Sequence, residues 1–141
     1  MSNPIAAVSI EDETSEATGR DIETLAHDTY SVFAIADGES VTNNVEIVLE
    51  GSPDREHWAP IDTRNEEDVL IEHNDFDECP DTGKQTAYIG GAVASHYIRY
   101  IRARIREPPD DADMTVWVMA NGNTDGRGVR PTERLGPAAE L

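Results

Sequence analysis

The chain has 141 residues and a formal net charge of −18, from 29 acidic residues against 11 basic ones. This length is typical of one domain with a core that needs no disulfide, and the single cysteine, Cys79, excludes an internal one. No apolar run approaches the roughly 18 residues of a membrane span, and the first residues lack the basic and apolar regions of a secretory signal. We therefore expect no contact with a membrane.

The basic residues are unevenly divided, since ten are arginine and Lys84 is the only lysine. Copies of so acidic a chain repel one another in dilute salt, whereas at molar salt the Debye length is about 3 Å and the repulsion is screened. This composition resembles that of proteins from salt-loving archaea, and we expect a halophilic source; an ordinary acidic protein is the alternative. Nucleic acid is not an expected partner, because phosphate contacts need a basic surface.

The chain reads as an extended arm, a run of strands and a second extended arm. Residues 1–20 are small, polar and acidic without a clear period, which predicts the first arm. Residues 121–141 are rich in Gly, Pro and Arg, which predicts the second. Between them, turn residues separate strand patterns at 20–26, 30–36, 45–50, 58–62, 68–73, 85–90, 96–106 and 114–120.

Alternation of apolar and polar residues identifies the strands. Val45, Ile47 and Leu49 alternate with Glu46 and Glu50, the period of a half-buried strand. We expect Pro60 to interrupt the strand at 58–62. We expect Gly90-Gly91 to end the strand at 85–90.

The spacing of these strands predicts an all-β fold. Residues 92–104 are long enough for a helix, but their Tyr and Ile content favours a strand. We therefore predict a single antiparallel β-sandwich, of jelly-roll or immunoglobulin-like type, over residues 21–120, with arms at 1–20 and 121–141. The pattern does not fix the strand order.

The stretch GSPDREHW collects Ser52, Asp54 and His57, the residue types of a hydrolytic triad. Triad members converge from separate elements, and Pro53 after Ser52 excludes a nucleophile elbow. A Ser-Pro-Asp turn that returns the chain to the core at Trp58 explains the stretch better. We predict that the protein is not an enzyme and has no catalytic residues.

Three motifs resemble those of small β-sandwich proteins of tailed-virus particles. They are V-x-I-V-L-E-G-S-x-D-x-x-x-W from Val45 to Trp58, Tyr97-Ile98-Arg99, and Thr-Val-Trp-Val from Thr115 to Val118. The resemblance covers roughly residues 45–120 and leaves both arms uncovered. It implies a structural or adhesive module without catalytic residues. Carbohydrate-binding sandwiches share part of the pattern, and Asp54-Arg55 replaces the usual Asp-Gly turn.

The acidic segment NDFDECPDTG, residues 74–83, contains the alternating carboxylates Asp75, Asp77 and Asp81. An EF-hand counted from Asp75 needs Gly and Glu where Pro80 and Thr86 stand, so it is excluded. A looser Ca²⁺ or Na⁺ site and a simple solvated loop both remain open.

Other cofactor motifs fail on spacing. GKQT at residues 83–86 has Glu78 where a phosphate-binding loop needs its first glycine. The four histidines and Cys79 lack the spacing of zinc ligands. We expect no cofactor.

The strand HYIRYIRARIR, residues 96–106, places Arg102, Arg104 and Arg106 on one face. Acidic side chains of a neighbouring strand could neutralise them across the sheet. Alternatively the stripe contacts an acidic neighbouring subunit, since the guanidinium fork binds carboxylates. The other interface candidates are in the second arm: Arg127, Arg130 and Arg134.

These observations predict a structural protein of a halophilic archaeal tailed virus, located in the virion as a capsid-decoration or tail component. It would act by assembly, as a homo-oligomer and with other virion structural proteins. The alternative is a module that binds a host surface glycan. An exposed aromatic pair beside residues 75–81 would favour glycan binding, whereas arms buried by other chains would favour assembly. Trp58 and Trp117 are expected to be core anchors rather than sugar platforms.

Overall fold

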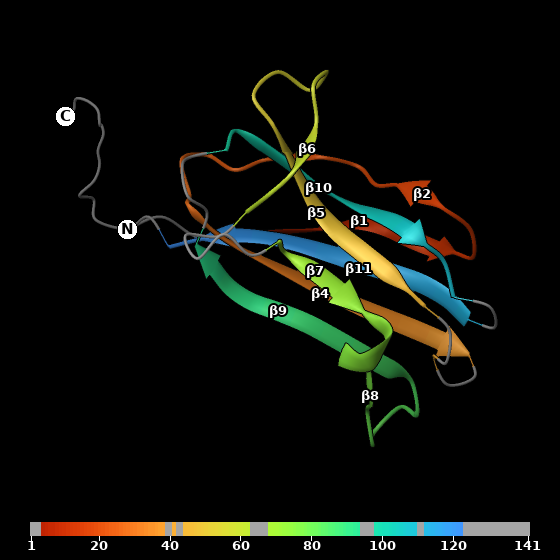
Figure 1. Cartoon of the computed structure of the whole chain (residues 1–141). Helices are drawn as coiled ribbons and strands as arrows, with labels where there is room; N and C mark the ends of the chain where they lie inside the picture. Colours follow the sequence, from red (N-terminus) through yellow and green to blue (C-terminus); the bar gives the residue numbers. More distant parts are fainter. Residues whose placement is uncertain are drawn as a thin grey trace.

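The computed structural model describes residues 4–38, 41, 44–62, 68–93, 98–109 and 112–122. Its strands form two antiparallel sheets that pack together (Figure 1). The predicted all-β sandwich is therefore confirmed.

The first sheet, sheet A, has the strand order β1-β11-β4-β9-β8. Its strands are β1 (Ile5–Glu13), β11 (Ala112–Asn121), β4 (Thr29–Gly38), β9 (Gln85–Val93) and β8 (Asp77–Glu78).

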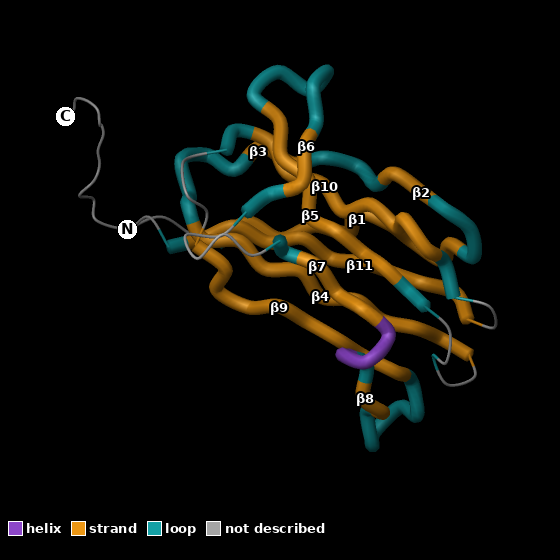
Figure 2. Tube along the Cα trace, in the orientation of Figure 1, coloured by secondary structure: helices purple, strands orange, loops and turns teal. Residues whose placement is uncertain are grey.

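The second sheet, sheet B, has the order β2-β10-β5-β6, with β3 also paired to β10 and β7 to β5. Its strands are β2 (Ala17–Thr18), β10 (Tyr100–Glu107), β5 (Glu46–Ser52), β6 (Ala59–Pro60), β3 (Ile22–Glu23) and β7 (Leu70–Glu72). A 3₁₀ turn, η1 (His73–Asp75), follows β7. Figure 2 shows the short strands β2, β3, β6 and β8 at the margins of the two sheets.

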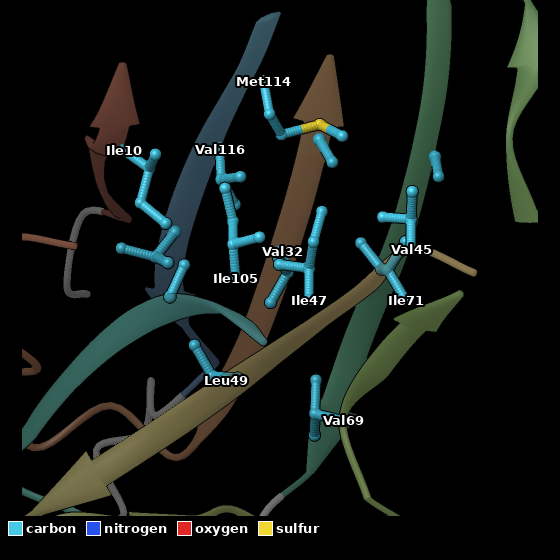
Figure 3. Packing of buried hydrophobic residues seen from close by; sticks show 14 of the residues in the cluster. Ile10, Val32, Val45, Ile47, Leu49, Val69, Ile71, Ile105, Met114 and Val116 are labelled. Atoms are coloured by element: carbon cyan, nitrogen blue, oxygen red, sulfur yellow. The ribbon is translucent and has the colours of Figure 1, made fainter. Parts of the chain in front are cut away.

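The core lies between the sheets and follows the alternation of the strands. Every second side chain of β4 and β11 points inward, including Val32, Met114 and Val116. Sheet B contributes Ile47 and Ile105, among others (Figure 3). Each large aliphatic side chain buried in this way stabilises the fold by about 1.5–3 kcal/mol.

The prediction of an N-terminal arm over residues 1–20 is wrong. Ile5–Glu13 forms β1, which pairs with β11 along its length, and Ile10 is part of the core. Register shifts occur between Val8 and Ile10 and again between Ile10 and Glu13. Such bulges add residues to one strand, so they erase the two-residue period by which strands are recognised. The sandwich therefore starts well before residue 21.

Two other boundaries differ from the prediction. Gly90-Gly91 does not end β9, which bulges there between the pairs Val32–Ile89 and Tyr30–Ala92 and continues to Val93. The expected strand at 20–26 is reduced to Ile22–Glu23. Residues 94–97 and 123–141, which include most of the predicted second arm, lie outside the described residues.

Candidate interaction surfaces

The turn after β5 is built around the Asp54 carboxylate. Asp54 Oδ1 accepts hydrogen bonds from the backbone N–H groups of Glu56 and His57 at 2.8 and 2.9 Å, and Oδ2 lies 2.7 Å from His57 Nδ1. These bonds hold the pKa of Asp54 well below its usual range; the backbone donors of His57 and Glu56 have the largest effect, followed by the His57 ring. The Ser52 hydroxyl donates to Asp54 at 3.1 Å rather than to His57. The contacts are those of the predicted turn, because a triad needs the base beside the nucleophile.

The predicted arginine stripe lies on the outer side of β10. The residues that alternate with the arginines, Ile101, Ala103 and Ile105, point inward and fill the core. We call this surface the arginine face. It comprises the outward side chains of sheet B and the turn beside them: Glu46, Glu50, Arg55, Trp58, Arg99, Tyr100, Arg102, Arg104 and Arg106.

Glutamates of β5 pair with all three arginines of the stripe. Arg102 Nε lies 2.9 Å from Glu50 Oε1, and Arg104 lies 3.3 Å from Glu50 Oε2. Arg106 lies 3.3 Å from Glu46. Neutralisation by a neighbouring strand, one of the two interpretations of the stripe, is therefore confirmed.

Burial separates the two glutamates. Glu50 is only 3% exposed, although it lies on the outward side of the sheet. Its carboxylate is thus removed from water and stabilised by two guanidinium groups. A contact of the arginine face with an acidic subunit remains a prediction, and Arg127, Arg130 and Arg134 lie outside the described residues.

Aromatic rings stack on these arginines. The Arg102 guanidinium carbon lies 3.9 Å from the centre of the Trp58 ring. The guanidinium carbons of Arg55 and Arg99 lie 4.4 and 5.1 Å from the centre of the Tyr100 ring. Trp58 is half-buried against the outside of sheet B, so the prediction that it anchors the core is wrong. Its role is to cover Arg102 by a cation–π contact.

A hollow of about 500 Å³ opens beside Trp58. The turn after β5 and the residues before β10 line it with Pro53, His57, Ala59, Ile98 and Arg99, among others. The hollow could receive an apolar side chain with an acidic neighbour.

A second surface lies on the outer side of sheet A. Val8 is the cross-strand partner of Trp117, Trp117 of Phe33, and Phe33 of Tyr88. Cross-strand partners share one face, so these side chains form a row across β1, β11, β4 and β9. The Phe33 and Tyr88 rings are stacked, with centres 6.0 Å apart and planes 17° apart. We call the row and its flanking positions the aromatic face: Ala6, Val8, Ser31, Phe33, Ile35, Thr86, Tyr88, Thr115, Trp117 and Met119.

Trp117 belongs to this face, so the prediction that it is a core anchor is wrong. Trp117 is 38% exposed, and Tyr88 is 68% exposed. The inward positions of β11 are filled by its neighbours Val116 and Val118. Because side chains alternate along a strand, the buried valines on either side of Trp117 predict that Trp117 faces outward. The hydrophobicity of Trp117 itself suggests that it faces the core.

All ten positions of the aromatic face are uncharged, and acidic residues begin at its margins. Asp37 and Asp113 are cross-strand partners at one end, with Lys84 3.6 Å from Asp37. Asp77 of β8 pairs with Thr86, two residues before Tyr88. The stacked Phe33–Tyr88 pair thus lies beside the acidic segment.

The described part of the chain contains no group of three or more His, Cys, Asp or Glu side chains placed to hold a metal ion. No helix among the described residues is long and apolar enough to cross a membrane.

No protein-family model matches the chain, and no curated protein matches it. Among solved structures, one match to this chain is the crystal structure of the SPBc2 prophage-derived protein YomS. The two chains are 10% identical, the match covers 84% of this chain and 92% of that chain, and the TM-score is 0.46. At this identity and TM-score the similarity decides neither the function nor the site.

Proposed function

We propose that this chain is a non-enzymatic structural protein of a tailed-virus particle, at the capsid surface or in the tail. It works by assembly with neighbouring subunits, which cover the aromatic face. The observation that carries the proposal is the composition of that face, which has ten uncharged positions and three aromatic rings on a chain of net charge −18. Apolar patches of a few hundred Å² on a monomer are often functional, and aromatic residues are enriched in the cores of interfaces.

The acidic composition supports assembly in concentrated salt. Two copies of the chain repel each other at low ionic strength, and at molar salt this repulsion reaches only about 3 Å. The association of apolar surfaces persists under those conditions. The proposed source is therefore a virus of a halophilic archaeal host, and assembly should weaken on dilution into low salt.

The experiment is incorporation into particles. Tyr88→Asp places a charge at the most exposed position of the aromatic face, and we expect particles grown with this variant to lack the protein, as measured by mass spectrometry of purified virions. Leu25→Asp is the matched control, because Leu25 is 61% exposed, lies outside the face and has a φ of 51° that Asp tolerates. Equal incorporation of the two variants would contradict the proposal.

Binding of a host surface glycan is the second candidate, and the stacked Phe33–Tyr88 pair beside the acidic segment, of which Tyr88 is exposed, favours it. However, the two rings stack on each other, which covers ring faces that a sugar would need. The candidates are separated by titrating the chain with neutral and acidic oligosaccharides while Trp117 fluorescence is recorded in a Trp58→Phe variant. A saturable change that Tyr88→Ala abolishes would establish the glycan-binding module.

A further inference from the structure

We propose that the aromatic face docks on the aromatic face of a second copy of this chain. The two sheets A would stack about a two-fold axis that runs close to the strand direction, between β11 and β4. This inference rests on the proposed function, because it names the neighbour that covers the face and the geometry of the contact.

The residues of the central row indicate this axis. The row runs Val8, Trp117, Phe33, Tyr88 from one side of sheet A to the other. A two-fold axis along the strands reverses the row of the second copy, so Tyr88 lies opposite the partner copy's Val8, and Trp117 opposite its Phe33. The most exposed side chain of the row then meets the smallest member of the row. An axis across the strands would instead oppose Tyr88 to Tyr88 and leave a gap between two valines.

The positions beside the row support interdigitation. On one side of the row lie Ala6, Met119 and Ser31, and on the other lie Thr115, Ile35 and Thr86. Most of these side chains are smaller than the rings of the row. The aromatic row of one copy can therefore pack against the smaller side chains beside the row of the other copy. Side chains interdigitate in this way between stacked sheets about 10 Å apart.

The size of the face predicts a weak, reversible contact. It spans four strands about 4.8 Å apart and five positions of about 3.3 Å each, which gives roughly 300 Å² of flat area per copy. A stable complex buries about 800 Å² per partner. The dimer should therefore form only at high protein concentration in solution. It would persist in a particle, where further contacts hold each subunit in place.

The acidic margins predict how the dimer responds to salt. The proposed axis brings the Asp37 and Asp113 ends of the two copies together, and Lys84 neutralises only part of that charge. Like charges oppose docking at low ionic strength, and screening removes the opposition. Dimerisation should therefore strengthen with NaCl, whereas a contact made by ion pairs of the arginine face would weaken.

Cross-linking of single-cysteine chains tests the geometry. Cys79→Ser provides the background, and Val8→Cys and Tyr88→Cys are prepared separately in the full chain. At 3 M NaCl and high protein concentration, a mixture of the two should be cross-linked by a short bis-maleimide. Either variant alone should give little product. In the proposed dimer the same position in the two chains is separated by about three strand spacings, roughly 14 Å. Leu25→Cys mixed with Val8→Cys serves as the control for random collision.

The outcomes separate this inference from the proposed function. Cross-linking in the mixture, lost when Trp117→Asp is added to both chains, supports the two-fold contact. Equal products from the mixture and from each variant alone, or from the Leu25 control, would overturn it. Absence of product from a mixture that sediments as monomer at millimolar concentration would also overturn it. In that case, loss of Tyr88→Asp from virions would still support assembly with a different neighbour.

Discussion

Replacement of Glu50 by Gln removes one negative charge from between two arginines and tests the electrostatic design of sheet B. Glu50 is 3% exposed and binds both Arg102 and Arg104. Gln keeps the size and one acceptor oxygen but leaves the guanidinium groups without their counter-charge. The Arg102 side chain is only 19% exposed and cannot recover full hydration, whereas Arg104 is half-exposed and can.

The expected cost follows from this difference in burial. Removing one partner of a fully buried ion pair costs about 3–5 kcal/mol. Since Arg104 rehydrates and Gln retains a hydrogen bond, we expect Glu50→Gln to lower the free energy of unfolding by about 2–3 kcal/mol. For a domain of this size, that corresponds to a fall in the melting temperature of about 6–12 °C.

Glu46→Gln is the control on the same strand. Glu46 and Arg106 are each 36% exposed in their side chains, so this pair is worth at most about 1 kcal/mol. Both variants are measured by thermal unfolding in 3 M NaCl, where exposed pairs are screened and buried pairs are not. Equal melting temperatures for the two variants would refute the conclusion that burial gives Glu50 its importance.

Three further predictions concern the termini, pH and salt. Deletion of residues 1–18 should abolish the cooperative unfolding seen by circular dichroism, because it removes β1 and Ile10; a folded truncated chain would show that β1 is dispensable. Asp54→Asn should destabilise by a constant amount above about pH 5 and by a shrinking amount below about pH 4, since a carboxyl whose folded pKa is lowered loses its contribution as pH falls toward that pKa; a difference independent of pH down to 2 would argue against the hydrogen-bonded carboxylate. Lowering NaCl from 3 M to about 0.1 M should reduce the melting temperature, because the Debye length grows to about 10 Å; an unchanged value would contradict adaptation to salt.

The strands that could be predicted are those whose two faces differ. In β5 and at the residue before it, Val45, Ile47 and Leu49 occupy every second position, with Glu46 and Glu50 on the other face, and all three are buried. In β1, two bulges break the period, so the segment resembled an arm although it pairs along β11. Strand pairing between segments far apart in the chain depends on tertiary packing, which a local pattern does not contain.

The surfaces were predictable to different degrees. The arginine stripe followed from alternation along β10, and its neutralisation by acidic side chains of a neighbouring strand was one of two interpretations of that stripe; which glutamates meet it depends on the register with β5. The aromatic face was missed because the run from Val116 to Met119 is apolar on both sides of β11, with Val116 inside and Trp117 outside. Hydrophobicity alone does not show which side of such a run faces the core. The length of the strand and its neighbours in the sheet determine that side.

The exposure of Tyr88 in the free chain and in the assembled particle tests the proposed assembly most directly. Hydroxyl-radical footprinting read by mass spectrometry reports side-chain accessibility in both states at the same molar salt. Tyr88, which is 68% exposed in the free chain, should be labelled there and protected in purified virions, while Leu25, 61% exposed and outside the face, should be labelled in both. Equal labelling of Tyr88 in the free chain and in the particle would contradict assembly through the aromatic face.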